Sequence, residues 1–299
     1  MNSTLAILAI LDGISYAALV FLVSVGLSLI FGVLRVVNVA HGSLYAFGAY
    51  LAATFSLAIA PLSPWLTYPA LIAASIVIGV VCGGFIERFL LRPLYGRDDV
   101  LQLLITFAAF MIMDNLQRLL WGVQPIFAAE PLKLLPNISV FGVNYTSYQV
   151  ILLPCVALAT LFGLRYFLRR TLAGAVILAV TEDREVSTAI GIDAKRVYFV
   201  TFVIGASFAA LGGALASPTT SLVPGMGADM IVLSFAVAAT AGLGQIEGTA
   251  LTALMIGLTR AFIIYIHPEF EVLVPYLLMV LVLLVRPFGL FGGTQVRKI

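Results

Sequence analysis

Charged residues are scarce in this sequence. Of its 299 residues only 10% are Asp, Glu, Lys or Arg, whereas 62% are hydrophobic, and the mean hydropathy is +1.12. Soluble domains carry about a quarter charged residues, so this composition excludes a soluble globular domain. Runs of about 20 mostly apolar residues are long enough to cross a bilayer as helices. The sequence therefore predicts an all-α, polytopic transmembrane helical bundle, and a net charge of +2 gives no reason to expect nucleic acid as a partner.

Cysteine and histidine are nearly absent as well. Cys82 and Cys155 lie in apolar stretches without metal-ligand or redox spacing, and His41 and His267 are far apart in the sequence. We expect two buried thiols, no disulfide and no metal site. The sequence also has no G-x-x-x-x-G-K-[ST], H-E-x-x-H or G-x-S-x-G motif. The chain is therefore not expected to be an enzyme, and we expect no cofactor bound to it.

The first apolar run has no basic residue before Arg35, so it lacks the positive region of a cleaved signal peptide and is expected to be retained. Asp12 and Gly13 are expected to separate a peripheral first turn from the first true crossing. Hydropathy predicts nine spans in one domain, 1–299, or eight if one weak segment only dips into the membrane. The nine ranges are 5–34, 36–60, 68–86, 100–120, 148–167, 198–217, 230–244, 249–266 and 272–285.

The placement of basic residues predicts the orientation of these spans. With the N-terminus outside and nine crossings, Arg35 and the basic residues of 88–97, 165–196 and 286–298 all lie in the cytoplasm, as the positive-inside rule requires. Only Arg118, Lys133 and Arg260 do not. We therefore expect a bacterial inner-membrane protein with a periplasmic N-terminus and a cytoplasmic C-terminus.

The longest polar interruption, residues 165–198, is larger than a chain reversal between two spans needs. Apolar residues from Val176 to Ile190 are interleaved with a charge cluster at 182–185, and Gly191 stands where a short helix would end. This pattern predicts an amphipathic helix lying under the membrane. A solvated surface loop is the alternative interpretation of the same charges.

Two stretches resemble a known family. The sequence AVTEDREVSTAIGIDAKRVYFVTFVIGASFAALGGAL resembles the cytoplasmic loop and following span of permeases from branched-chain amino acid ABC import systems. The sequence GLSLIFGVLRVVNVAHGSLYAFGAYLA resembles the N-terminal signature of the shorter permease of the pair, the LivH type. The pattern of spans between them agrees, so the resemblance covers nearly the whole chain.

The resemblance implies a bacterial importer in which ATP and Mg are bound by two partner ATPase subunits. It also implies a homologous second permease subunit (LivM type), which completes the pathway as a hetero- or homodimer in the membrane lipid, and a periplasmic substrate-binding protein. A coupling helix at about 173–189, within a cytoplasmic segment 168–197, would sit in a cleft on the ATPase. The residues carried over to this contact are Glu182, Asp183, Arg184, Glu185, Ala189 and Gly191.

Polar residues inside the apolar runs are the second candidate site. Asn38, His41 and Gly42 open the second span, where they either satisfy backbone groups at a helix break or line a translocation pathway. Arg260 lies within the eighth span and is expected to pair with Asp229, Asp114 or a group on the second permease. It is a packing ion pair, a snorkelling side chain or a transient contact for a substrate carboxylate.

Asp114 and Arg118 are four residues apart on one helix, which predicts a local ion pair. The turn before the eighth span reads AGLGQIEGTA, with Gln245 and Glu247 where the family favours smaller residues. Branched-chain amino acids are the expected cargo, with urea, short amides or aromatic acids as alternatives. An ion-coupled secondary transporter is a different class, but it would leave the long cytoplasmic segment unexplained.

Overall fold

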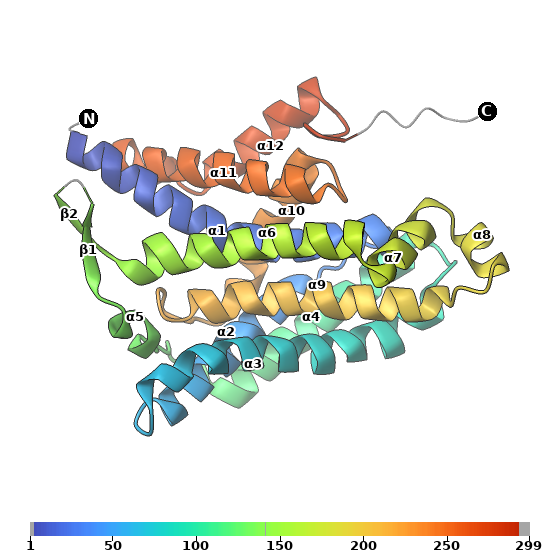
Figure 1. Cartoon of the computed structure of the whole chain (residues 1–299), viewed down its shortest axis with the longest axis horizontal. Helices are drawn as coiled ribbons and strands as arrows, with labels where there is room; N and C mark the ends of the chain where they lie inside the picture. Colours follow the sequence, from blue (N-terminus) through green and yellow to red (C-terminus); the bar gives the residue numbers. More distant parts are fainter. Residues whose placement is uncertain (1–2, 141, 293–299) are drawn as a thin grey trace.

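The computed structural model describes residues 3–140 and 142–292. Within them the chain is an elongated bundle of helices with one small β-hairpin at one end (Figure 1). Seven helices in this described part are long and apolar enough to cross a membrane, and Leu172–Glu182, Met226–Ala241 and Leu273–Val285 are shorter apolar helices. The helices are α1 (Ser3–Leu34), α2 (His41–Ile59), α3 (Thr67–Ile78), α4 (Asp99–Trp121), α5 (Glu130–Leu134), α6 (Leu153–Arg170), α7 (Leu172–Glu182), α8 (Arg184–Ala189), α9 (Ala194–Ala216), α10 (Met226–Ala241), α11 (Ile246–Ile266) and α12 (Leu273–Val285).

Two of the membrane helices extend beyond their regular α-helical part. The span of α3 runs from Pro64 to Leu94 through wider, π-type turns at Gly79–Gly83 and Ile86–Leu91. The span of α6 begins at Tyr148. The hairpin pairs β1 (Asn137–Val140) with β2 (Val143–Thr146) in antiparallel register.

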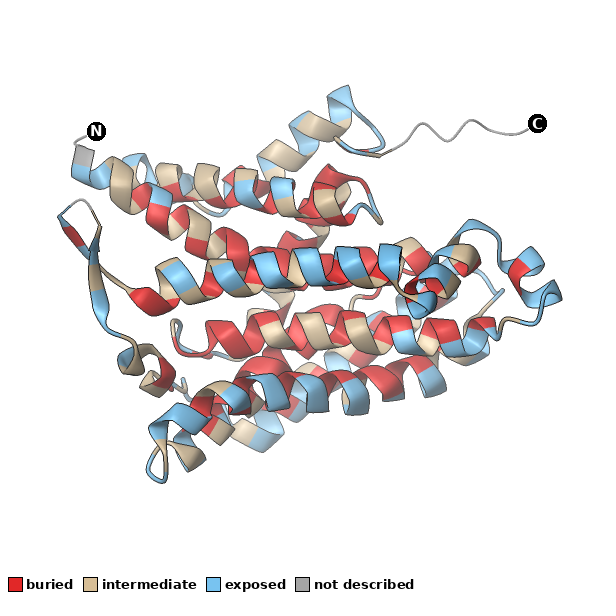
Figure 2. Ribbon diagram, in the orientation of Figure 1, coloured by how far each residue is buried: buried red, intermediate tan, exposed pale blue. Residues whose placement is uncertain are grey.

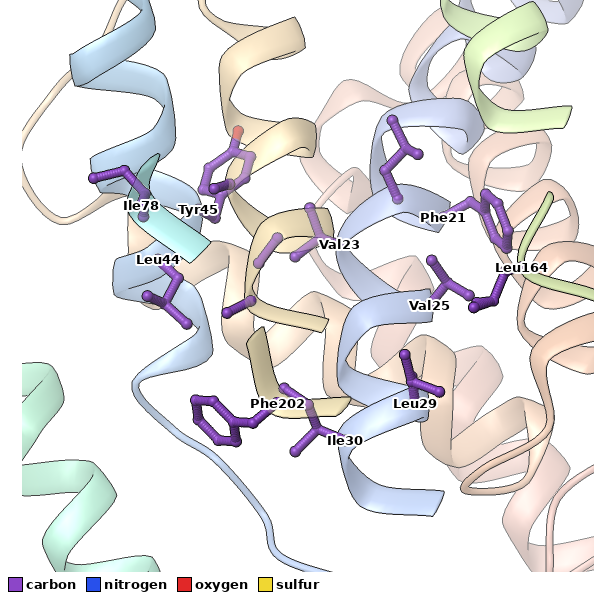
Figure 3. Packing of buried hydrophobic residues seen from close by; sticks show 14 of the residues in the cluster. Phe21, Val23, Val25, Leu29, Ile30, Leu44, Tyr45, Ile78, Leu164 and Phe202 are labelled. Carbon is purple, nitrogen blue, oxygen red and sulfur yellow. The ribbon is translucent and has the colours of Figure 1, made fainter. Parts of the chain in front are cut away.

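The core of the bundle lies around α1, whose buried face packs against α9 and α11. Figure 3 shows Phe21, Val23, Val25, Leu29 and Ile30 of α1 among residues of α2, α3, α6 and α9. The outer faces of α4 and α6 are instead exposed and apolar (Figure 2). In a membrane protein such faces are covered by lipid or by a partner subunit, so they carry no burial cost.

Helices α1–α3 and α9–α11 are arranged as two inverted sets. α1 lies antiparallel to α9, and the two cross at Gly26 and Gly205, whose backbones touch. α1 packs extensively on α11, and α9 correspondingly packs on α3. The N-terminal turns of α2 and α10 meet at Gly42 and Gly227. Inverted sets of this kind, each with a helix that begins inside the bundle, occur in many membrane transporters.

The basic clusters gather at one end of the bundle. Arg35, Arg165 and Arg169 line one cavity there, and Arg88, Arg92, Lys195 and Arg196 line another. The three exceptions expected from the sequence, Arg118, Lys133 and Arg260, lie toward the opposite end, where α1 begins (Figure 1). The described basic residues of the predicted cytoplasmic loops thus lie at the end opposite to these three, although the last residues of the basic tail, 293–299, lie outside the described residues.

Three local expectations are corrected. Ser3–Leu34 is one uninterrupted helix, because Gly13 does not break it but packs against Gly257 and Leu258 of α11. The coupling segment is not one helix over 173–189, since Asp183 adopts an extended conformation and separates α7 from α8. The two thiols are not both buried, because Cys155 is exposed on the outer face of α6 and Cys82 is only partly covered.

Candidate functional site

The segment between α6 and α9 folds into two short helices, each begun by a side-chain cap. The Thr171 hydroxyl accepts a hydrogen bond from the Gly174 amide at 3.1 Å, which starts α7. The Asp183 carboxylate accepts from the Val186 amide at 3.0 Å, which starts α8. Caps of this kind satisfy amides that have no partner within the helix. The sequence therefore encodes a defined bend at Asp183 rather than a flexible loop.

Helix α7 is anchored and α8 projects. Ile177 and Val180 are almost fully buried against the bundle, and Gly174 lets α7 approach the backbone of Phe167 and Leu168 closely. The outer side of the segment exposes all four charged residues at the bend together with large apolar side chains (Figure 2). The exposed charged residues are Glu182, Asp183, Arg184 and Glu185, and the exposed apolar ones are Leu172, Leu178, Val186 and Ile190.

Gly191 ends α8, as the sequence predicts. Its φ of +96° lies in the left-handed region, its amide donates to the Thr188 carbonyl at 3.1 Å, and the Ile192 amide donates to the Ser187 carbonyl at 3.0 Å. This pair of bonds is the Schellman motif, for which glycine is preferred. Ala189 occupies the last turn and is exposed. The side chain of Arg184 turns back over the Tyr198 ring, 5.5 Å from its centroid, and so ties α8 to α9.

The second candidate group lies in the centre of the bundle, where residues 35–40 run without helical structure before α2 begins at His41. Asn38 and His41 are fully buried. The His41 Nε2 atom is 2.9 Å from the Val23 carbonyl of α1, so Nε2 is the donor. The Thr106 hydroxyl of α4 accepts from the Val39 amide at 3.3 Å, and its proton is shared between the Leu103 carbonyl of α4 at 3.0 Å and the Val37 carbonyl at 3.3 Å. Side chains from other helices thus satisfy part of this non-helical backbone.

Asn38 itself is not satisfied. Neither its side-chain nitrogen nor its oxygen has a hydrogen-bond partner within the described part of the chain, and the same is true of His41 Nδ1. Leaving such groups unpaired in an apolar interior costs on the order of 1–3 kcal/mol each. Gly42 next to them touches α10, because a Cβ there would lie 2.1 Å from the Gly227 carbonyl oxygen. The structure therefore brings Asn38, His41 and Gly42 together where α1, α2 and α10 meet.

Arg260 lies apart from both groups, toward the end of the bundle where α1 begins. Its partner is neither Asp229 nor Asp114 but Glu271, and its guanidinium stacks on the Tyr16 ring at 3.9 Å from the centroid. Helical spacing does not predict Glu271 as the partner, because a turn through Pro268 separates it from α11. Asp114 is engaged locally, with Arg118 at 2.8 Å, as the spacing predicts.

Glu247, one of the two departures from the family turn, forms a contact that the sequence did not predict. Its carboxylate is 2.9 Å from Arg169 and 3.9 Å from Arg165, so it joins the first turn of α11 to the end of α6. These three residues and Glu182 line a cavity of about 460 Å³ beneath α7. Gly242 and Gly244, before α11, both have positive φ, a backbone conformation that glycine adopts without strain.

A bundle of apolar helices with inverted halves, non-helical polar backbone at its centre and a projecting helical bend at one end has the organisation of a membrane transport protein. The family model for the permease component of branched-chain amino acid transport systems matches residues 9–283, and the chain belongs to this family. It is a family of multi-pass membrane permeases rather than of enzymes.

Curated relatives match over nearly their whole length. The chain is 31% identical to the high-affinity branched-chain amino acid transport system permease protein BraD of Pseudomonas aeruginosa, covering 97% of both chains. It is 27% identical to LivH of Escherichia coli, covering 96% of both. Among solved structures, PsaBC from Streptococcus pneumoniae in complex with Fab aligns with a TM-score of 0.49 and 13% identity over 91% of this chain and 90% of that chain.

Proposed function

We propose that this chain is a permease subunit of an ATP-driven importer of branched-chain amino acids in the bacterial inner membrane. The observation that carries the proposal is the match of the permease family over residues 9–283, together with relatives whose names specify branched-chain amino acid transport. A second, homologous permease would complete the pathway, two ATPase subunits would bind ATP and Mg, and a periplasmic binding protein would deliver the substrate.

In this proposal α7 and α8 form the ATPase contact. The anchored helix α7 is suited to transmit a displacement, because its buried residues Ile177 and Val180 leave it little freedom to move independently of the bundle. The exposed charges and apolar residues of the bend would meet a complementary cleft. Residues 182–185, with Ala189 and Gly191 supporting the second helix, are the proposed coupling surface.

The transport pathway in this proposal passes the centre of the bundle. Asn38 and His41 would offer unpaired polar atoms to the substrate or to water as the two halves change their relative angle. Gly42 would permit that close contact between α2 and α10.

The test is charge reversal at the bend, with Glu182→Lys and Asp183→Lys combined, in the importer reconstituted with its partners. We expect normal membrane insertion, but ATP-driven leucine uptake should fall by at least tenfold, and hydrolysis should no longer respond to the loaded binding protein. Lys133→Glu, on an exposed pair at the other end of the bundle, is the matched control and should transport normally. Unchanged uptake and stimulation in the double variant would refute the coupling role.

A further inference from the structure

A small cavity lies between the ends of α1, α6 and α11 and the turn that follows α9. Its volume is about 210 Å³, below the roughly 300–1,000 Å³ of sites for drug-sized ligands. It is lined by Asp12 and Tyr16 of α1, Gln149 before α6, Thr219 and Thr220, and Arg260 and Tyr265 of α11. Ionisable groups within membrane helices are costly, and they mark functional sites more often than other positions do.

The charges of the cavity are incompletely compensated. Asp12 accepts a hydrogen bond from the Tyr265 hydroxyl at 2.5 Å, but within the described residues no basic group forms an ion pair with it. One guanidinium nitrogen of Arg260 donates to Glu271, and one face of the guanidinium lies over the Tyr16 ring. A guanidinium has five N–H donors, so others remain for a ligand. The cavity walls therefore carry Asp12, which has no basic partner among the described residues, and Arg260, whose remaining N–H groups can donate to a ligand.

Uncharged polar side chains line the same cavity as Asp12 and Arg260. The Gln149 side-chain oxygen accepts from the Thr146 hydroxyl at 2.7 Å, which leaves the NH₂ group of the amide to donate elsewhere. Thr219 and Thr220 donate their hydroxyl protons to the Ala216 carbonyl, so their oxygens are free to accept. The cavity wall therefore carries further donors and acceptors besides Arg260 and Asp12.

The remaining wall is aliphatic. Leu19, Leu153, Ala261 and Ile264 line the same cavity, and Leu153 and Ala261 are almost fully buried. A ligand that satisfies all three surfaces has an ammonium group, a carboxylate and a short hydrocarbon side chain. Urea and short amides have no charge for either ionic surface, and an aromatic acid without an amino group leaves Asp12 unpaired.

We propose that this cavity binds the zwitterion of an aliphatic α-amino acid, with its ammonium group on Asp12 and its carboxylate on Arg260 and Gln149. This inference rests on the proposed function, and it names a substrate site at the end of the bundle where α1 begins, separate from Asn38 and His41. In the proposed topology that end faces the periplasm, so the cavity would be accessible to substrate from that side.

The experiment compares three probes of one hydrocarbon shape on the intact transporter complex in nanodiscs, without ATP. The probes are L-leucine, 3-methylbutylamine, which lacks the carboxylate, and 4-methylpentanoate, which lacks the ammonium. Binding is followed by saturation-transfer NMR titration. We expect leucine to bind at least about tenfold more tightly than either analogue, since a lost charge-assisted bond is worth roughly a factor of ten or more.

The variants should separate the two ionic contacts. Asp12→Asn should weaken leucine at least tenfold and leave 4-methylpentanoate unchanged, whereas Arg260→Gln should weaken leucine and leave 3-methylbutylamine unchanged. Gln149→Leu, which removes a donor without touching the Glu271 pair, provides the carboxylate test if Arg260→Gln does not fold. Arg118→Gln and Asp114→Asn are matched controls, because this ion pair lies on α4 outside the cavity.

The proposal is overturned if all three probes bind equally or if the cavity variants bind leucine like the wild type. Failure of the importer proposal is a different result, because it appears as absence of ATP-driven leucine uptake by the wild-type complex. Competent uptake with unchanged leucine binding in Asp12→Asn and Gln149→Leu would leave the importer intact and refute this site alone.

Discussion

Gly42 and Gly227 show how one missing side chain determines the geometry of the centre. A Cβ on Gly42 would lie 2.1 Å from the Gly227 carbonyl oxygen and 2.8 Å from Ile231 Cβ. Both neighbours are buried, and one of them is backbone, so neither can rotate away. Any larger residue must separate α2 from α10 and with them the segment that carries Asn38 and His41.

We therefore expect Gly42→Ala to lower the stability of the purified protein by about 1–3 kcal/mol, the usual cost of overpacking, and to reduce transport. The measurement is thermal unfolding in detergent alongside an uptake assay. Gly163→Ala is the control, because nothing lies within 4 Å of a Cβ at Gly163. There the change should stabilise α6 by about 0.5–1 kcal/mol through its higher helix propensity. Equal effects at the two positions would contradict this account.

The contacts of single residues are only partly predictable from the sequence. Asp114 with Arg118, and Gly191 as a helix end, were predictable because each depends on spacing within a few residues of one helix. The partner of Arg260 was not, because Glu271 reaches it from beyond a turn, and Tyr16 reaches it from the other end of the chain. The sequence of the turn shows Glu247 as an unusual residue, but its pairing with Arg169 depends on how α6 and α11 meet in space.

Among the helices, the bend between α7 and α8 places the buried apolar residues and most of the exposed charges on different helices, whereas the sequence predicts both on one helix. The expected single helix, about 173–189, would have carried apolar anchors and charges along one rod. The Asp183 cap instead places the anchors on α7 and most of the exposed charges on or beside α8. Hydrophobic periodicity could not reveal this, because one capping side chain can break a helix without interrupting the pattern.

The end of α8 gives a prediction at this scale. Gly191→Ala places a side chain at φ +96°, which costs on the order of 1–2 kcal/mol. We expect faster amide exchange in 184–192, unchanged exchange in α7, and weaker coupling of ATP hydrolysis to uptake. Hydrogen exchange followed by mass spectrometry measures the first two.

Gly191→Asn is the matched control, because asparagine tolerates the left-handed conformation better than alanine does. It should show a smaller increase in exchange than Gly191→Ala. If alanine and asparagine behave alike, backbone conformation at this position is not what holds α8.

At the scale of the whole molecule, composition and charge placement were sufficient for the class and for the order of the helices. The centres of the predicted spans lie in observed helices, since a run of about 20 apolar residues has few alternatives to a membrane helix. The inverted packing of α1–α3 against α9–α11 was not predictable, because the glycines at the contacts between the two sets share no pattern that hydropathy can detect.

The orientation of the molecule can be tested directly. In a background of Cys82→Ser and Cys155→Ser, we expect Ser139→Cys, in the hairpin, to react with a membrane-impermeant maleimide in intact spheroplasts. Thr188→Cys, in α8, should react only after lysis. Both positions are exposed, so differences in reactivity report sidedness rather than burial. Reaction of Thr188→Cys in intact spheroplasts would reverse the topology and remove the basis for an ATPase contact at the bend.

The two glycine crossings have a mechanical consequence. Where Gly26 meets Gly205 and Gly42 meets Gly227, backbone rests on backbone, and no side chain stands between them to cushion a shift by changing rotamer. Similar close contacts occur where Gly48 meets Ala210 and Gly213 meets Tyr45, so the two sets interlock along α2 and α9 as well. A displacement at any one of these contacts must therefore move helices of both sets together, because backbone atoms cannot make room by changing rotamer.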